Sequence, residues 1–300
     1  MSDSHDDEYH KFTGPQREAT AVQTLHGLVN GIVIDGVLRD RERDAMRSWL
    51  ADHDDLKFRS TFAAMSIALQ RDLIDANAYE QSVVEDLLDA LHRLSDLEQF
   101  YDDDTKDTQR LHGIIAGIAS DGRIELAELV SFRDWLNDHD HLAGLWPFED
   151  ISSVVREVLA DGNIDAAEHE LLLNLFASFL RDSDRRALDI PFTELDKPLS
   201  GICAHCPTVT FAESSFCFTG SSDRGSRSIL REHVEQWGGE FHPKIRTSTD
   251  YLIVCGLGND SWAYECYGRK VEKAMEMRRS GSKIMVVHEY DFWDALEDAG

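Results

Sequence analysis

The chain has 300 residues, of which 57 are acidic and 30 basic, so its formal net charge at pH 7 is −27. Such an acidic excess excludes a protein that binds nucleic acid over its whole surface, because the phosphate backbone would be repelled. The sequence shows no signal-like segment and no apolar run near eighteen residues, and it holds only five cysteines. We therefore expect a cytoplasmic protein that makes no contact with a membrane.

The charge is distributed unevenly along the chain. Residues 1–200 contain 42 acidic and 19 basic side chains, whereas residues 201–300 contain 15 and 11. A chain of this length can form two domains, each with its own core. We expect any contact with DNA to be made by the C-terminal part.

The N-terminal two thirds of the chain contain an internal repeat. Residues 1–19 are predicted to be a disordered acidic tail. In the region 20–182, LHGLVNGIVIDG (Leu25–Gly36) recurs as LHGIIAGIASDG (Leu111–Gly122), and SWLADHD (Ser48–Asp54) recurs as DWLNDHD (Asp134–Asp140). Both pairs are 86 residues apart, which indicates a duplication with repeats at about 25–94 and 111–180.

Each repeat contains the shorter pattern Asp-Gly-x-Ile/Leu-x-x-x-Glu. It occurs at Asp35–Glu42, Asp121–Glu128 and Asp161–Glu168, and a decayed copy is predicted at Asp72–Glu80. The pattern predicts helix, tight turn, helix: the aspartate accepts turn N–H groups, the glycine takes the left-handed backbone, and the glutamate lies in the next helix's first turn. ADGNIDAAE (Ala160–Glu168) resembles the hallmark turn of TerB-like tellurite-resistance domains, which implies an all-helical domain.

Two metal sites are considered and not predicted. Asp121, Gly122 and Glu128 match positions 5, 6 and 12 of an EF-hand loop, but Gly117 and Ala119 stand at positions 1 and 3, where ligand oxygens are needed. Cys203-x-x-Cys206 is half of a zinc site without a second pair. We expect a structural turn and no metal or cofactor; the alternative is that the helical domain is a cation-sensing module.

After a connector at 183–209, the segment 210–300 alternates short apolar runs and helical patterns. Strands are predicted at Ser215–Thr219, Tyr251–Val254 and Ile284–Val287, and helices at Arg227–Trp237 and Arg269–Arg279. Runs that are apolar on both faces are typical of a parallel sheet covered by helices. We therefore predict an all-α domain followed by an α/β domain with a small four-stranded parallel sheet.

Five motifs in this segment follow one another in a characteristic order: FCFTG (216–220), WGGE (237–240), TDYLIVCG (249–256), GRKVEKAMEM (268–277) and EYDFWDAL (289–296). They resemble the BRCT domain, most closely the type that ends bacterial NAD-dependent DNA ligases. The resemblance implies a module without catalytic chemistry that binds phosphate on a modified protein or on a DNA end.

The resemblance also implies the site residues. Thr219 and Gly220 match the Thr/Ser-Gly pair of phosphate-binding members, Lys270 or Lys273 matches their lysine, and Arg227 matches the arginine of DNA-end-binding members. A helix N-terminus with a nearby lysine suits an oxyanion. The alternative is structural: Thr-Gly closes the strand turn, and the lysines lie on a solvated helix face.

The motifs of common enzymes are missing from the sequence. It contains no Walker phosphate loop, no GxSxG elbow, no GxGxxG after a strand and no KxDG motif of a ligase. We predict a non-enzymatic adaptor in bacterial DNA metabolism or stress response, whose BRCT-like domain binds a phosphorylated protein or a 5′-phosphate DNA end. The acidic helical domain would dock a protein partner. The alternatives are a cation-sensing stress protein, and a BRCT-like domain used only for structural association, including with a second copy of the chain.

Overall fold

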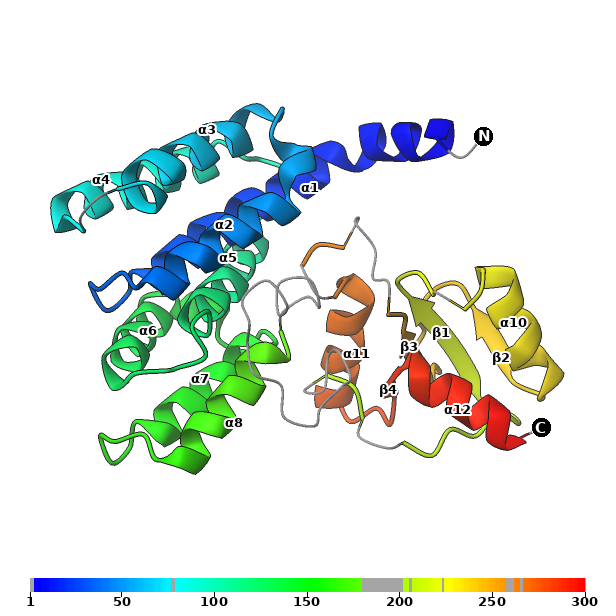
Figure 1. The fold of residues 1–300 in the computed structure, drawn as a ribbon. Helices are drawn as coiled ribbons and strands as arrows, with labels where there is room; N and C mark the ends of the chain where they lie inside the picture. Colours follow the sequence, from blue (N-terminus) through cyan, green and yellow to red (C-terminus); the bar gives the residue numbers. More distant parts are fainter. Residues whose placement is uncertain are drawn as a thin grey trace. The chain divides into compact units, whose positions relative to one another are not determined.

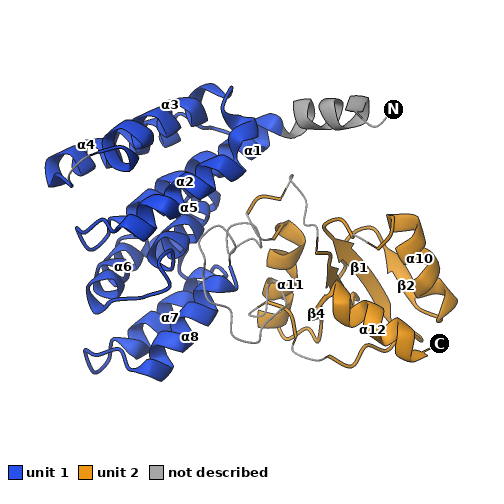
Figure 2. Ribbon diagram, viewed as in Figure 1, with its two compact units in different colours: residues 1–192 blue, residues 193–300 orange. Residues whose placement is uncertain are grey.

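The computed structural model describes residues 3–76, 79–179, 202–204, 207–222, 224–256, 262–264 and 267–299, with residues 3–13 described by their backbone only. The chain divides into two compact units, residues 1–192 and 193–300 (Figure 2). The first unit is helical, and the second contains a four-stranded parallel sheet flanked by helices (Figure 1). The predicted fold class is therefore confirmed. The predicted connector at 183–209 lies mostly outside the described residues.

Two equivalent sets of helices form the helical unit. They are α1 (Asp3–Ile32), α2 (Asp40–Asp52), α3 (Ser60–Leu69) and α4 (Gln81–Asp96), then α5 (Asp103–Ile118), α6 (Leu126–Asp138), α7 (Phe148–Val158) and α8 (Ala166–Ala177). A single 3-10 turn follows α2 at Asp54–Leu56 and α6 at Asp140–Leu142. The same order of elements supports the predicted duplication.

Matching side-chain interactions support the duplication further. His53 Nδ1 lies 2.8 Å from the Trp49 carbonyl oxygen, and His139 Nδ1 lies 2.8 Å from the Trp135 carbonyl oxygen. In both repeats the imidazole stacks on the indole, with 3.8 Å between ring centres. Because the members of each pair are 86 residues apart, the local geometry repeats with the sequence.

The two repeats meet along α1 and α5, which lie side by side (Figure 1). Glycines line this contact on both helices, at Gly27, Gly31, Gly113 and Gly117. A Cβ on Gly27 would lie 2.1 Å from the Arg110 carbonyl oxygen, and a Cβ on Gly113 would lie 2.2 Å from the Thr24 carbonyl oxygen. Any side chain at these positions would force the backbones apart, so glycine is required for the contact.

The three Asp-Gly turns have the predicted geometry. Gly36, Gly122 and Gly162 have φ angles of 77°, 76° and 75°. In each turn the aspartate Oδ1 accepts a hydrogen bond, 2.9 Å long, from the backbone N–H of the residue two positions later in the chain. The glutamate of each pattern accepts the N–H of the residue before the next helix, which satisfies a donor that helix geometry leaves unpaired.

The decayed copy predicted at Asp72–Glu80 does not form this turn. Asp72 lies inside a π-helical turn, Gln70–Ile74, that continues α3. The following residues, Asp75 and Ala76, include no glycine that could take the left-handed backbone. The prediction is therefore wrong at Asp72, and residues 77–78 lie outside the described residues.

Part of the predicted disordered tail of residues 1–19 is folded. Helix α1 begins at Asp3, and Ala19 is fully buried. Arg17 forms a 2.6 Å ion pair with Asp55, and Glu18 Oε1 accepts the Thr61 N–H at 3.1 Å. The prediction is wrong for residues 14–19. Once packing has fixed one part of a helix, each further residue adds one backbone hydrogen bond, so the helix can continue into a polar segment. The composition of residues 1–19 therefore does not show where α1 begins.

The α/β unit forms its sheet from strands in the order β2-β1-β3-β4, all parallel. Its elements are β1 (Ser215–Thr219), α10 (Arg227–Gln236), β2 (Glu240–His242), β3 (Tyr251–Val254), α11 (Arg269–Arg279), β4 (Met285–His288) and α12 (Glu289–Ala299). The last strand is shifted by one residue from its predicted position. Because β1 is an inner strand covered on both faces, all five of its residues are buried.

Aromatic side chains form the core on the face of the sheet covered by α10 and α12. Phe292 of α12 contacts Phe216 and Phe218 of β1 edge-on, with ring centres 6.2 and 5.2 Å apart. Leu230 and Val234 of α10 complete this cluster. Helix α11 covers the opposite face (Figure 1). The carboxyl end of β1 therefore lies between the first turns of α10 and α11.

Candidate phosphate-binding site

Side chains alternate along β1 and give its two faces different chemistry. Phe216 and Phe218 point into the aromatic core, so Cys217 and Thr219 belong to the face toward α11. The strand ends at Gly220, whose φ of 80° is a backbone conformation that glycine adopts without strain. All the predicted site residues except Lys273 are found at this end of the strand.

Lys270, the second residue of α11, reaches the end of β1. Its Nζ donates to the Phe218 carbonyl oxygen at 2.7 Å and to the Pro243 carbonyl oxygen at 2.9 Å. The ammonium group thereby connects β1 with the segment that follows β2. Both acceptors are neutral, so the positive charge of Lys270 is not cancelled by them.

Arg227, the first residue of α10, approaches the same strand end. Its guanidinium donates to the Gly220 carbonyl oxygen and lies 5.9 Å from the centre of the Phe218 ring. The aromatic contact and the hydrogen bond fix the guanidinium beside the turn. Here too the acceptor is neutral.

Cys217 belongs to the same group, although sequence reasoning did not include it. Burial raises the pKa of its thiol, while Lys270 and Arg227 both act to lower it, so the thiol lies close to both cations. The strand alternation could have indicated this position, since residues 217 and 219 share a face.

The remaining predicted residues fall into two groups. Thr219 is buried, and within the described residues its hydroxyl forms no hydrogen bond. Gly220 follows it directly. Lys273, by contrast, is largely exposed and forms a 2.8 Å ion pair with Glu276 on its own helix. The structure thus brings Thr219, Gly220, Arg227 and Lys270 together and uses Lys273 elsewhere.

The charge balance at this strand end suits an anion. Among the described residues, the hydrogen-bond acceptors of Arg227 and Lys270 are backbone carbonyl oxygens, and neither side chain forms an ion pair with a carboxylate. Two cations, an unbonded hydroxyl and a glycine turn at a helix N-terminus are groups that bind phosphate oxygens. The arrangement can hold an oxyanion.

The described part of the chain contains neither a cluster of metal-ligating side chains nor a helix that could span a membrane. No group of three or more His, Cys, Asp or Glu side chains there is placed to hold a metal ion. None of its helices is long and apolar enough to cross a membrane. The Cys203-x-x-Cys206 pattern, which is considered as half of a zinc site and is not predicted to bind metal, includes Cys206, which lies outside the described residues.

Comparisons with known proteins give one similarity. The chain is 33% identical over 86 residues to a DNA ligase of Fervidobacterium nodosum, which covers 29% of this chain and 11% of the ligase. No protein-family model and no solved structure matches. The similarity agrees with a ligase-related region in this chain. Nothing in these comparisons supports the resemblance of residues 20–182 to TerB-like domains.

Proposed function

We propose that the protein is a non-enzymatic adaptor in DNA metabolism, and that its BRCT-like α/β unit binds the 5′-phosphate of a DNA end. The observation that carries this proposal is the pair of cations at the end of β1. Arg227 and Lys270 donate to neutral backbone carbonyls, and neither has a carboxylate partner among the described residues. The similarity to a DNA ligase favours a DNA end over a phosphorylated protein as the source of the phosphate.

The helical unit has a complementary role in this proposal. Its large negative charge repels the DNA backbone, so we propose that it docks a protein partner. DNA would then be contacted only through the α/β unit, whose charge is near balance. This arrangement would limit binding to ends rather than to the whole length of a duplex.

The competing function is structural association through the α/β unit. The observation in its favour is that Lys270 connects two backbone segments of the unit and therefore stabilises the fold itself. In that case the cations would serve the fold alone, and the unit would pack against another chain. The two functions differ in whether a terminal phosphate changes affinity.

The test is a titration of the full chain with one duplex that carries either a 5′-phosphate or a 5′-hydroxyl, at two salt concentrations. We expect tighter binding of the phosphorylated end. Arg227→Ala should reduce that affinity by about ten- to a hundredfold, since hydrogen bonds to charged groups contribute about 1.5–3 kcal/mol. Lys270→Ala should act likewise, with its thermal stability measured in parallel.

Lys273→Ala is the matched control, because it removes the same charge from the same helix but from an ion pair outside the site. It should change affinity little. If the wild-type chain does not distinguish the two duplex ends but binds a phosphoserine peptide through Arg227, the ligand is a phosphoprotein. If the wild-type chain distinguishes neither the two duplex ends nor the phosphoserine peptide from its unphosphorylated form, the structural function replaces this proposal.

A further inference from the structure

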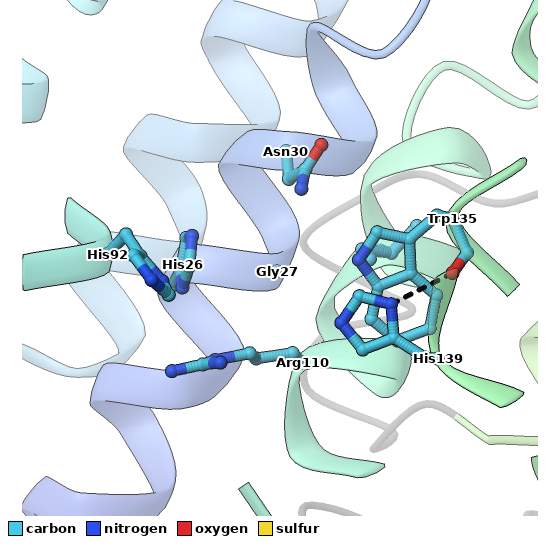
Figure 3. A pocket seen from close by; sticks show the side chains of 8 residues that line it. His26, Gly27, Asn30, His92, Arg110, Trp135 and His139 are labelled. Atoms are coloured by element: carbon cyan, nitrogen blue, oxygen red, sulfur yellow. Dashed lines mark hydrogen bonds between the residues drawn. The ribbon is translucent and has the colours of Figure 1, made fainter. Parts of the chain in front are cut away.

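The helical unit contains a pocket of about 190 Å³ between the two repeats (Figure 3). Gly27 of α1 lines the pocket, which therefore lies at the glycine-lined contact between α1 and α5. The polar and aromatic side chains that line it come from four helices: His26, Asn30, His92, Arg110, Trp135 and His139. None of these residues belongs to the candidate phosphate site.

The side walls of the pocket are formed by rings. His26 of α1 and His92 of α4 form one wall, with ring centres 5.6 Å apart. Trp135 of α6 and His139, which directly follows α6, form the other and stack at 3.8 Å with 16° between their planes (Figure 3). The stacked pair gives the pocket one flat wall, while the His26 and His92 rings opposite it are inclined by 52° to each other. One flat aromatic wall facing imidazole and amide groups suits a flat ligand that can also form hydrogen bonds.

The charges around the pocket favour an uncharged ligand. The Arg110 guanidinium donates to Asp107 and to Asp96, each at 2.9 Å, so its charge is already balanced by two carboxylates. Burial, together with the nearby Arg110, lowers the pKa of His26 to about 3, which keeps this imidazole neutral. The surrounding unit is strongly acidic, so a free anion would be repelled.

The second repeat shows that the fold does not require an open pocket here. At the equivalent position His112 is buried, and Phe179 stacks on it with 5.9 Å between ring centres. The first repeat has the exposed Arg93 where the second has Phe179, 86 residues later. Trp49, the counterpart of Trp135, is also buried and contacts Phe62. The space beside His112 is therefore filled, whereas the equivalent space beside His26 is open.

We propose that this pocket binds an uncharged planar heterocycle of the size of one nucleobase, such as the base of a free nucleoside. Pockets for drug-sized ligands occupy roughly 300–1,000 Å³, so this smaller volume fits a single ring system. The ring would lie between the imidazole wall and the indole wall. The His26 imidazole and the Asn30 amide both contain donor and acceptor atoms, as the edge of a base requires.

The pseudo-symmetry supplies variants that test the proposal without disturbing the core. Asn30→Ala and His92→Ser introduce the residues that the second repeat carries at the equivalent positions, Ala116 and Ser178. His92 is exposed and Asn30 is half-buried, so both changes should leave the fold intact. Arg93→Ala, at the exposed neighbour of His92, is the matched control.

The experiment titrates the full chain with adenosine, uridine and AMP by ligand-observed NMR and calorimetry. We expect saturable binding of at least one nucleoside, weaker binding of AMP, at least a tenfold loss of affinity in the double variant, and no change in Arg93→Ala. Circular dichroism would verify that each variant is folded. The proposal is overturned if neither nucleoside binds at millimolar concentration, if AMP binds more tightly than adenosine, or if the double variant binds like the wild type.

Discussion

The two units of the protein use their basic side chains in opposite ways. In the helical unit, Arg39 lies within 4.0 Å of four carboxylates from both repeats: Asp35, Glu42, Glu125 and Glu128. In the α/β unit, Arg227 and Lys270 donate to carbonyl oxygens and have no carboxylate partner among the described residues. Arg39 thus joins the two repeats through ion pairs, whereas the described hydrogen-bond acceptors of Arg227 and Lys270 are neutral.

The two units also differ in how their interiors are packed. The helical unit depends on close approach of two backbones along a row of glycines, and on an arginine shared between repeats. The α/β unit depends on an aromatic core, in which Phe292 contacts two phenylalanines of β1. We therefore expect the helical unit to be the more sensitive to small changes at the contact between its repeats.

The largest effect is expected from Gly113→Val. The added side chain would meet the α1 backbone, starting with a Cβ 2.2 Å from the Thr24 carbonyl oxygen, so α1 and α5 must separate. The free energy of unfolding of the helical unit should fall by about 3 kcal/mol or more, measured by chemical denaturation. Gly14→Ala is the control, because its Cβ would meet only the mobile end of the Arg59 side chain. Equal effects of the two changes would contradict the packing argument.

Arg39→Met should have the next largest effect. At pH 9, above the raised pKa of both groups, it would leave the buried carboxylates of Glu42 and Glu128 without their cation, at a cost of about 2–3 kcal/mol in the free energy of unfolding. The measurement is denaturation of the helical unit followed by circular dichroism. A loss below about 0.5 kcal/mol would show that the carboxylates avoid the cost by taking up protons.

The stability of the helical unit should depend on pH because of these carboxyl groups. Burial raises the pKa of Glu42 to about 7 and that of Glu128 to about 8 from an ordinary value near 4.5. Folding therefore favours the protonated forms, so the stabilisation is complete below about pH 4.5 and is lost as the pH rises through 7 to 8. Each unit of pKa shift corresponds to about 1.4 kcal/mol.

The variant that isolates this effect is Glu128→Gln, which fixes the group in its uncharged state. It should reduce the slope of unfolding free energy against pH between about 5 and 8 and stabilise the unit at pH 8 and above. An unchanged slope would show that Glu128 ionises in the folded protein as it does in water.

Arg227→Met is the counterpart of Arg39→Met in the α/β unit. The substitution is the same, so a difference in the loss of unfolding free energy reports on the surroundings of each arginine. We expect a change in unfolding free energy of the α/β unit below about 1 kcal/mol, because one hydrogen bond to a carbonyl and one aromatic contact are lost. A loss as large as that of Arg39→Met would show that Arg227 serves the fold rather than a ligand.

The smallest effect is expected from calcium. The Asp-Gly turns use their aspartates to accept backbone N–H groups, and positions 1 and 3 of an EF-hand loop have no ligand oxygen. Millimolar calcium should therefore leave the melting temperature of the helical unit almost unchanged. A rise of many degrees that Glu128→Gln abolishes would support the cation-sensing alternative.

Local sequence patterns were sufficient to predict much of the fold. The 86-residue spacing predicted two equivalent sets of helices, and the Asp-Gly pattern predicted turns whose glycine, aspartate and glutamate all have the expected geometry. The apolar runs at 215–219 and 251–254 predicted strands that form an inner pair of the sheet. These features depend on neighbours within a few residues, so periodicity and turn chemistry determine them.

Contacts between distant residues decided what the sequence could not show. Lys270 and Lys273 are three residues apart on one helix, and only packing placed Lys270 against β1 and left Lys273 with Glu276. Likewise, His26 and His112 occupy equivalent sequence positions, but Phe179 closes the space beside His112 only. A side chain's partners and its access to solvent depend on elements far away in the chain, and a one-dimensional pattern contains no such distances.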